Sequence, residues 1–144
     1  MTRDEFLSTF KQRGATTAPG ISTADITRTN VMLQGMRAAI MPGALTDFYT
    51  ACGGMFIGSG YIFGPHEIAR GTAYPVPSIT DINKEMAPLT QTANKTVFGR
   101  NDLFLFAFDA FGTFYMLDNL NMRPLRKYDN LYNAMTDCLA AGQI

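Results

Sequence analysis

Residues 103–118 read LFLFAFDAFGTFYMLD and hold the most clearly signalled element of the chain, a β-hairpin. Two runs of residues that favour strands, Leu103 to Phe108 and Thr113 to Leu117, flank the tetrapeptide Asp109-Ala110-Phe111-Gly112. Aspartate at the first position and glycine at the fourth are typical of a type I turn. The spacing therefore predicts two antiparallel strands joined by a tight turn.

Both faces of the first strand of this hairpin are apolar. Side chains alternate between the two faces of a strand. One face therefore carries Leu103, Leu105 and Ala107, and the other carries three phenylalanines at 104, 106 and 108. A sheet with one face in water would alternate apolar and polar residues. Either other segments cover both faces, or one face is open to a partner, and we expect two covered faces because most such strands are buried.

Helices are predicted at both ends of the chain. Thr2 and Glu5 have the spacing of a capping box, and Gly14 ends the run that follows them. At the other end, Asp129 is the expected N-cap and Gly142 lies just beyond the predicted helix. Apolar residues recur at helical spacing in both segments: Phe6, Leu7 and Phe10 in the first, and Leu131, Ala134, Met135, Cys138 and Leu139 in the second.

The middle of the chain shows a third helix and two short strands. Pro42 suits the first turn of a helix, and Gly53-Gly54 suits its end. Residues 55–57 and 61–63 are predicted strands, and a short helix begins at Ser78. Residues 25–40 are ambiguous, because a cap is present but the residues after it favour a helix only weakly. The remaining segments are expected to be a helical turn at 65–70, turns over most of 71–94, a strand that begins at 96–98 and a solvated basic loop at 123–127.

These elements predict a single α+β domain spanning residues 1–144, with a mostly antiparallel sheet packed by N-terminal and C-terminal helices. At 144 residues and 47% hydrophobic content, one core is enough to stabilise the chain. The formal net charge of zero argues against general nucleic-acid binding. The longest apolar run, Leu103 to Phe108, is far shorter than the roughly 20 residues of a membrane span. The first residues lack the apolar stretch of a secretory signal, so we expect a cytoplasmic protein with Cys52 and Cys138 as thiols.

Residue types that carry chemistry are sparse and scattered. His66 is the only histidine, and nothing in the sequence marks Ser59 or Cys52 as a nucleophile for it. The two cysteines and His66 do not have the ligand spacing of a zinc site. We therefore predict no catalytic residue, no metal site and no cofactor. Three aspartates, Asp102, Asp109 and Asp118, lie near the ends of the hairpin, where aspartate commonly serves turns and strand ends.

The order of the motifs resembles that of the SUKH superfamily, which includes a yeast regulator of cell-wall synthesis, the bacterial Syd protein and many bacterial immunity proteins. The resemblance covers about residues 40–140. Met41-Pro42 opens the short helix of the family pattern, followed by Leu45, Phe48-Tyr49, Gly53-Gly54 and Glu67-Ile68. The strand hairpin with Asp109-Ala110-Phe111-Gly112 and Asp118, and the closing helix, complete the pattern. Met41 replaces the usual leucine, and the chain has no tryptophan.

The resemblance implies a non-catalytic protein-binding domain, since no catalytic residues come with this family. For bacterial members it implies an immunity protein that neutralises a cognate toxin, in many cases a nuclease, by direct binding. If the partner is a basic nuclease, we expect the acidic residues and exposed aromatics of the hairpin to lie near the interface. The candidate partner-binding residues are Asp102, Asp109, Phe111, Tyr115 and Asp118.

Two other functions remain open. The aromatic hairpin could line an apolar pocket of above roughly 300 Å³, which would make the chain a small-ligand-binding or regulatory module on the same fold. The chain could also be an enzyme centred on His66. Core or turn packing is an equally good explanation for Phe111 and Tyr115.

Overall fold

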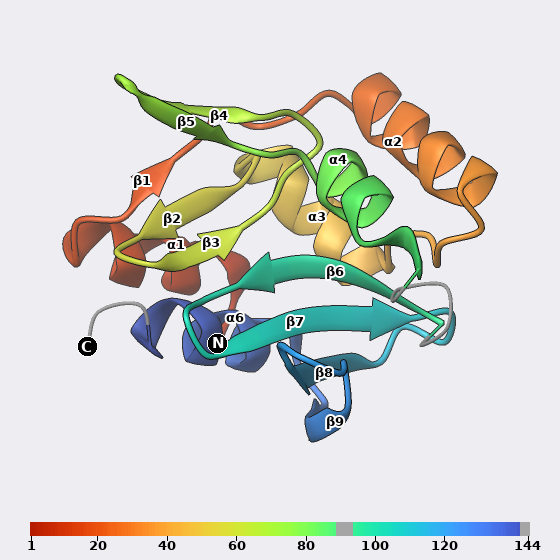
Figure 1. Ribbon diagram of the computed structural model, residues 1–144. Helices are drawn as coiled ribbons and strands as arrows, with labels where there is room; N and C mark the ends of the chain where they lie inside the picture. The colour runs from red at the N-terminus through yellow and green to blue at the C-terminus, as the bar shows by residue number, and fades with distance from the viewer. Residues whose placement is uncertain (89–93, 142–144) are drawn as a thin grey trace.

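In a computed structural model that describes residues 1–88 and 94–141, seven strands form one antiparallel sheet in the order β1-β2-β3-β6-β7-β8-β9 (Figure 1). The strands of this sheet are β1 (Thr16–Thr17), β2 (Met55–Ile57), β3 (Gly60–Ile62), β6 (Lys95–Arg100), β7 (Phe104–Asp109), β8 (Phe114–Asp118) and β9 (Pro124–Tyr128). A separate hairpin consists of β4 (Ile68–Arg70) and β5 (Ala73–Val76). The helices are α1 (Arg3–Gln12), α2 (Thr23–Gly35), α3 (Gly43–Ala51), α4 (Ile79–Glu85) and α6 (Leu131–Ala141).

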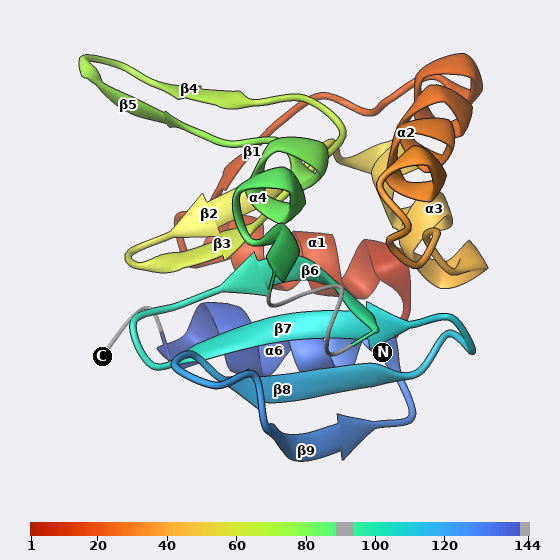
Figure 2. The ribbon, with the colours of Figure 1, turned by 45° about the vertical axis from the view of Figure 1, so that its right-hand side comes forward.

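The helices lie on both sides of the main sheet. In Figure 1, α1, α3 and α6 lie behind the sheet, α4 lies in front of it, and α2 stands at one end. The β4–β5 hairpin extends away from the rest of the molecule as an arm (Figure 2). The fold is therefore α+β, with an antiparallel sheet packed by helices from both ends of the chain, as the sequence predicts. No helix in the described ranges has the length and apolar character needed to cross a membrane.

The hairpin of residues 103–118 forms as predicted. The main-chain N–H of Gly112 donates to the carbonyl oxygen of Asp109 at 3.1 Å, which closes the turn. Phe108 pairs with Phe114 directly beside it. Leu105, Ala107, Phe106 and Phe108 are all buried, so both faces of β7 are covered. Leu103 is the exception, because it lies before the strand and is exposed.

The phenylalanine row of β7 faces α6. Phe108, Phe114 and Tyr128 lie opposite one another on three neighbouring strands, so their side chains share one face of the sheet. The Tyr128 hydroxyl donates to Asp137 Oδ2 on α6 at 2.7 Å. The ring centroids of Phe106 and Tyr128 are 6.5 Å apart. Helix α6 therefore covers this face of the sheet.

Helix α4 is fixed to β6 by a buried amide. Asn83 Nδ2 donates to the carbonyl oxygen of Val97, and the N–H of Val97 donates to Asn83 Oδ1, both at 2.8 Å. The β6–β7 pairing is irregular between Val97 and Gly99. The Asn83 side chain thus supplies the hydrogen bonds that a regular ladder would give to this buried main chain.

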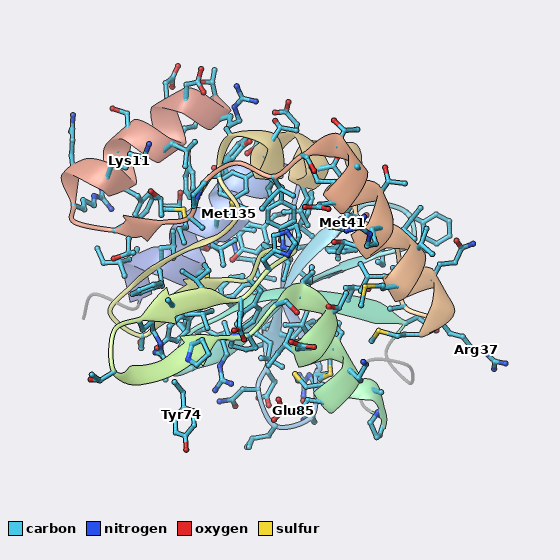
Figure 3. The ribbon with its side chains drawn as sticks, turned by 90° about the horizontal axis from the view of Figure 1, so that it is seen from above. Lys11, Arg37, Met41, Tyr74, Glu85 and Met135 are labelled. Carbon is cyan, nitrogen blue, oxygen red and sulfur yellow. The ribbon has the colours of Figure 1, made fainter. Side chains whose placement is uncertain are left out.

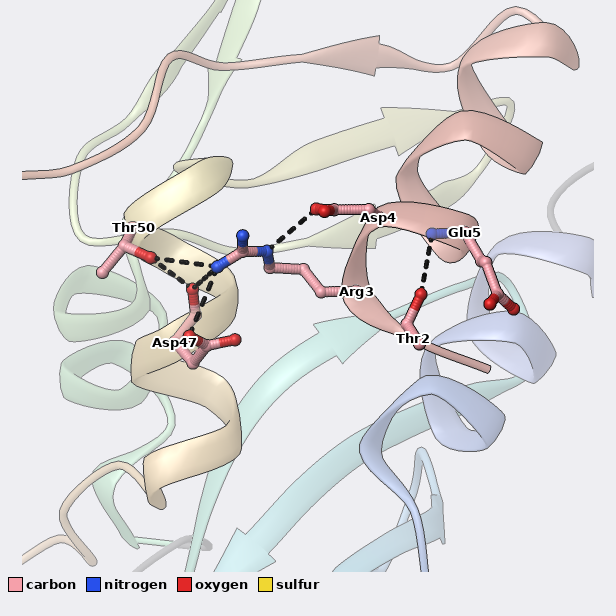
Figure 4. Close-up of polar contacts among 6 residues, drawn as sticks. All are labelled: Thr2, Arg3, Asp4, Glu5, Asp47 and Thr50. Carbon is pink, nitrogen blue, oxygen red and sulfur yellow. Dashed lines mark hydrogen bonds and ion pairs between the residues drawn. The ribbon is translucent and has the colours of Figure 1, made fainter.

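The N-terminal helix is capped as predicted and held to α3 (Figure 4). Thr2 Oγ1 accepts from the N–H of Glu5 at 3.2 Å. Arg3 Nη1 lies 3.3 Å from Asp47 Oδ1 on α3. The Phe6 ring packs between those of α3 and α6, with centroids 6.1 Å from Phe48 and 5.3 Å from Tyr132. Aromatic packing of this kind joins three helices into one layer.

The sequence leaves one segment in the middle of the chain ambiguous and gives wrong predictions for parts of two others. The ambiguous segment 25–40 contains most of α2, whose N-cap Ser22 accepts a hydrogen bond from the N–H of Asp25. The helix forms because burial of its apolar face outweighs the weak helix propensity of its residues. The helical turn expected at 65–70 is wrong, since Ile68–Arg70 form β4. Most of 71–94 was expected to be turns, but β5 lies there and pairs with β4, besides the predicted helix at Ser78.

Two expectations near the C-terminus are also wrong. The basic segment expected as a loop is the edge strand β9, which pairs with β8 although its first four residues are exposed. Asn130, not Asp129, supplies the cap of α6, because Asn130 Oδ1 accepts from the N–H of Tyr132 at 2.8 Å. Gly142, the expected end of this helix, lies outside the described residues.

Two main-chain segments cross in close contact at Gly53 and Gly64. A Cβ placed on Gly64 would overlap the carbonyl oxygen of Gly53. The crossing is locked from both sides, since the Tyr49 hydroxyl donates to the carbonyl oxygen of Phe63 and the N–H of Ile79 donates to that of Gly64. Only glycine fits at this point.

We expect Gly64→Ala to lower the free energy of unfolding by about 3 kcal/mol or more, because the main chain itself must move to admit a methyl group. Gly43→Ala is the matched control. Its added Cβ meets nothing within 4 Å and lies in the first turn of α3, where alanine is favourable. Urea unfolding followed by circular dichroism measures both changes, and equal stability of the two variants would contradict the crossing.

Candidate functional site

The structure separates the five predicted partner-binding residues into two groups. Asp102 precedes β7, and Asp118 pairs with the first residue of that strand. Asp109, Phe111 and Tyr115 lie at or near the opposite end of the strand. The seven residue-to-residue steps from position 102 to position 109 span about 20 Å in an extended chain. The predicted set therefore does not form one compact patch.

Asp109 holds the turn between β7 and β8. Its Oδ1 accepts from the N–H groups of Phe111 at 2.9 Å and Thr113 at 3.1 Å, and its Oδ2 accepts from the Tyr115 hydroxyl at 2.8 Å. Partial burial alone would raise the pKa of Asp109. The three hydrogen bonds and the charge of Lys95 outweigh that effect and lower the pKa below its usual value. The carboxylate is thus kept ionised by the turn that it holds.

Phe111 projects from this rigid turn into solvent. Its side chain is 93% exposed, although its main-chain N–H is bound by Asp109. The turn lies against Pro42, since a Cβ on Gly112 would be 3.7 Å from the Pro42 side chain. Ile40, two residues before that proline, is also exposed. We call these two exposed side chains, Phe111 and Ile40, the Phe111 face.

The Tyr115 side chain contacts two residues of the same chain, Asp109 and Lys95. Its hydrogen bond to Asp109 raises its pKa above the usual value, and partial burial adds to this. The Lys95 ammonium lies 4.9 Å from the centre of its ring. Tyr115 therefore supports the turn beneath Phe111 and is only partly accessible to a partner.

The aspartates at the other end differ from each other. Asp118 Oδ1 accepts from the N–H groups of Leu120 at 2.7 Å and Asn121 at 3.2 Å, so it also holds a turn. Asp102 is exposed, and its carboxylate accepts no hydrogen bond from residues 1–88 and 94–141. Of the three aspartates, Asp102 is the one whose charge remains available.

We expect Asp109→Ala to lower the free energy of unfolding by about 1–2 kcal/mol, because it leaves two main-chain donors and a hydroxyl without their acceptor. Asp102→Ala should change it by less than about 0.5 kcal/mol. Urea unfolding at neutral pH measures both. Similar losses for the two variants would contradict the structural role of Asp109.

The cost of Asp109→Ala should also depend on pH. The pKa of Asp109 is lower in the folded chain than the roughly 3.9 of an unfolded aspartate. Its contribution to stability is therefore fully present above pH 4 or so, and it is lost as the pH falls through the folded value. Unfolding curves of the wild type and Asp109→Ala should converge in acid.

A separate pocket of about 330 Å³ lies where the β4–β5 arm meets the main sheet. We call it the arginine pocket. It is lined by Ser59, Tyr61, Phe63, Arg70, Val76, Pro77, Ile82, Arg100, Asn101 and Asp102. The sequence prediction contained Asp102 and none of the others, because the pocket collects single residues from segments distant in the chain. The alternative function of a small-ligand module would place a pocket beside the aromatic residues of the β7–β8 hairpin, but this pocket lies at the other end of β7 from Phe111.

His66 lies in a different cavity, of about 420 Å³, beside the loop that precedes α2. Its Nε2 lies 3.2 Å from Asp25 Oδ2. Nε2 donates to this carboxylate in the tautomer that carries the proton on Nε2. Ser22 lines the same cavity, but its hydroxyl oxygen accepts from the N–H of Asp25. Within the described residues no nucleophile is hydrogen-bonded to His66, which a base-activated nucleophile would require.

Both thiols are buried and unpaired. Burial raises the pKa of Cys52, and it raises that of Cys138 far above the usual value. The Cys138 thiol points at main-chain carbonyl oxygens of Tyr61 and Arg100, at 3.5 and 3.4 Å. No group of three or more His, Cys, Asp or Glu side chains able to hold a metal ion occurs in residues 1–88 and 94–141.

We expect neither thiol to react with iodoacetamide in the folded protein at pH 8, because the reactive thiolate is suppressed and shielded. Both should react once urea unfolds the chain. Mass spectrometry of the alkylated protein measures this. Rapid modification of Cys52 or Cys138 in the native state would show that its site opens in solution.

Comparison with known proteins adds no family assignment. No protein-family model and no curated protein sequence significantly matches the chain.

Proposed function

We propose that this chain is a non-catalytic, SUKH-like protein-binding domain that neutralises a cognate bacterial toxin in the cytoplasm by binding it directly. The proposal rests on the motif order of residues 40–140 together with the Phe111 face. It identifies Phe111 as the anchor of the interface. The toxin's active residues would be blocked by contact, so the chain needs no reactive group of its own.

The exposure of Phe111 is the observation that carries this proposal. A large aromatic side chain gains stability from burial, yet this one is 93% exposed on a turn held by three hydrogen bonds to Asp109. Residues that dominate binding energy are enriched in aromatic side chains. A fixed main chain also reduces the entropy lost on association. Phe111 thus has the features of a preorganised anchor.

The charges near this turn favour an acidic partner surface. Lys127 lies opposite Tyr115 on the neighbouring strand, on the same face of the sheet as Lys95. The Asp109 carboxylate accepts hydrogen bonds from main-chain N–H groups of the turn itself. Complementary charge aids association, so we expect acidic groups on the toxin where it meets this end of the sheet. This pattern gives no support to the basic cleft of a nuclease as the contacted surface.

The proposal predicts a toxin gene beside the gene for this chain, and the test uses the toxin domain that it encodes. Isothermal titration calorimetry should give a nanomolar dissociation constant for the two purified proteins, and co-expression should restore growth of cells that produce the toxin. Phe111→Ala should weaken the complex by about 30-fold or more, as loss of an aromatic anchor does. Its thermal unfolding should match that of the wild type, because Phe111 is in solvent.

Tyr74→Ala is the matched control. Tyr74 is 88% exposed on the β4–β5 arm, where it points away from the body of the protein (Figure 3). Its loss should leave toxin affinity unchanged. The absence of any nanomolar complex would overturn the proposed function, and wild-type affinity of Phe111→Ala would overturn the assignment of the interface.

A further inference from the structure

We propose that the arginine pocket binds a small organic anion, with a carboxylate or phosphate held by Arg70 and Arg100 and a flat apolar group against the pocket wall. This inference is independent of the toxin-binding proposal. The Phe111 face and the arginine pocket lie at opposite ends of β7. A failed binding test at one site therefore does not contradict the proposal for the other.

The two arginines converge on one tyrosine. Tyr61 on β3 lies directly opposite Arg100 on β6, so their side chains project from the same face of the sheet as close neighbours. Arg70, from the arm, donates through Nη1 to the Tyr61 hydroxyl oxygen at 2.8 Å. Register and hydrogen bonding thus bring two guanidinium groups from distant segments into one pocket of about 330 Å³.

Arg70 is already held in position. Its Nε donates to the carbonyl oxygen of Tyr74 at 2.6 Å, and its guanidinium carbon lies 5.4 Å from the centre of the Tyr61 ring. A guanidinium has five N–H donors. These two hydrogen bonds leave three donors for a ligand, and little side-chain entropy remains to be lost on binding.

Neither arginine is neutralised by a close carboxylate. In residues 1–88 and 94–141, the ion pairs involve Arg3, Arg28, His66 and Arg126, and Arg70 and Arg100 form none. Two like charges that line one small pocket repel each other unless an anion lies between them. Paired guanidinium donors match the oxygens of a carboxylate or phosphate.

The rest of the wall selects for a flat apolar group. Phe63, Val76 and Ile82 are buried residues of its lining, and Tyr61 adds an aromatic residue to it. Ligand sites combine an apolar lining with a few placed polar groups, and a volume near 300 Å³ is at the small end of their range. An aromatic carboxylate or an aryl phosphate fits this combination better than an inorganic ion.

Asp102 gives the pocket a built-in opposing charge. It lines the same pocket, and its carboxylate accepts no hydrogen bond from the described residues. The lining therefore carries two positive charges and one negative charge. Removing the negative charge should strengthen binding of an anion, whereas removing either positive charge should weaken it.

The test is an NMR titration of the full ¹⁵N-labelled chain with four probes: benzoate, phenyl phosphate, inorganic phosphate and neutral benzamide. Benzoate or phenyl phosphate should shift the amide signals of Ser59, Tyr61 and Asn101 in a saturable way, with a dissociation constant of about 1 mM or tighter. Inorganic phosphate should bind more weakly, and benzamide should not bind. Which of the two aryl anions binds tighter identifies the preferred anionic group.

Variants separate recognition from general charge effects. Arg100→Gln should weaken binding about tenfold or more, since one charge-assisted contact is lost. Arg100 is exposed at a strand end, so this variant is expected to fold. Asp102→Asn should tighten binding several-fold. Arg123→Gln, which removes a positive charge outside the pocket, is the matched control and should leave affinity unchanged.

Three results would overturn the inference. The first is no saturable shift at the pocket with either aryl anion. The second is equal binding of benzamide, which would show that the anionic group is not recognised. The third is equal weakening by Arg100→Gln and Arg123→Gln, which would show attraction to net charge alone. Arg70→Gln is a supporting variant, because loss of its bond to Tyr74 also affects the arm.

Discussion

Burial of β7 on both faces is the constraint on which the rest of the fold depends. The strand presents phenylalanines to one side and Leu105 with Ala107 to the other, and all the central ones are buried. Each fully buried phenylalanine or leucine side chain contributes about 1.5–3 kcal/mol. A sheet with such a centre cannot leave either face in water. Helices on both sides, α6 behind and α4 in front, follow from that single strand (Figure 2).

Where α4 covers the front face of the sheet, buried main-chain groups of β6 need hydrogen-bond partners that the sheet itself does not supply. The sheet is irregular where α4 meets it, at Val97 and Gly99. A buried N–H and carbonyl group without partners would cost more than one hydrogen bond provides. The amide of Asn83 satisfies both groups of Val97, and Asn83 is itself completely buried. One polar side chain thus allows a helix to lie against an interrupted strand.

The parts of the fold that could be predicted from sequence are those with strong local signals. The turn at Asp109 to Gly112 and the caps at Thr2 and Ser78 depend on residues within a few positions of each other. The strands β4 and β9 could not be predicted, because their partners and not their own composition make them strands. The arginine pocket was missed for the same reason, since Arg70 and Arg100 meet only through Tyr61 and the sheet register.

The two candidate sites also show why residue type alone does not identify a binding residue. Asp109 and Asp102 are the same residue type near the ends of the same strand, yet one carboxylate is used by a turn and the other remains available. Phe111 is set apart from the buried phenylalanines by the turn that Asp109 holds, not by its own chemistry. What makes a side chain available for recognition is that the fold has no other use for it. By this criterion Phe111, Asp102 and Arg100 stand out, whereas Asp109, Tyr115 and Asp118 are engaged in hydrogen bonds within the fold.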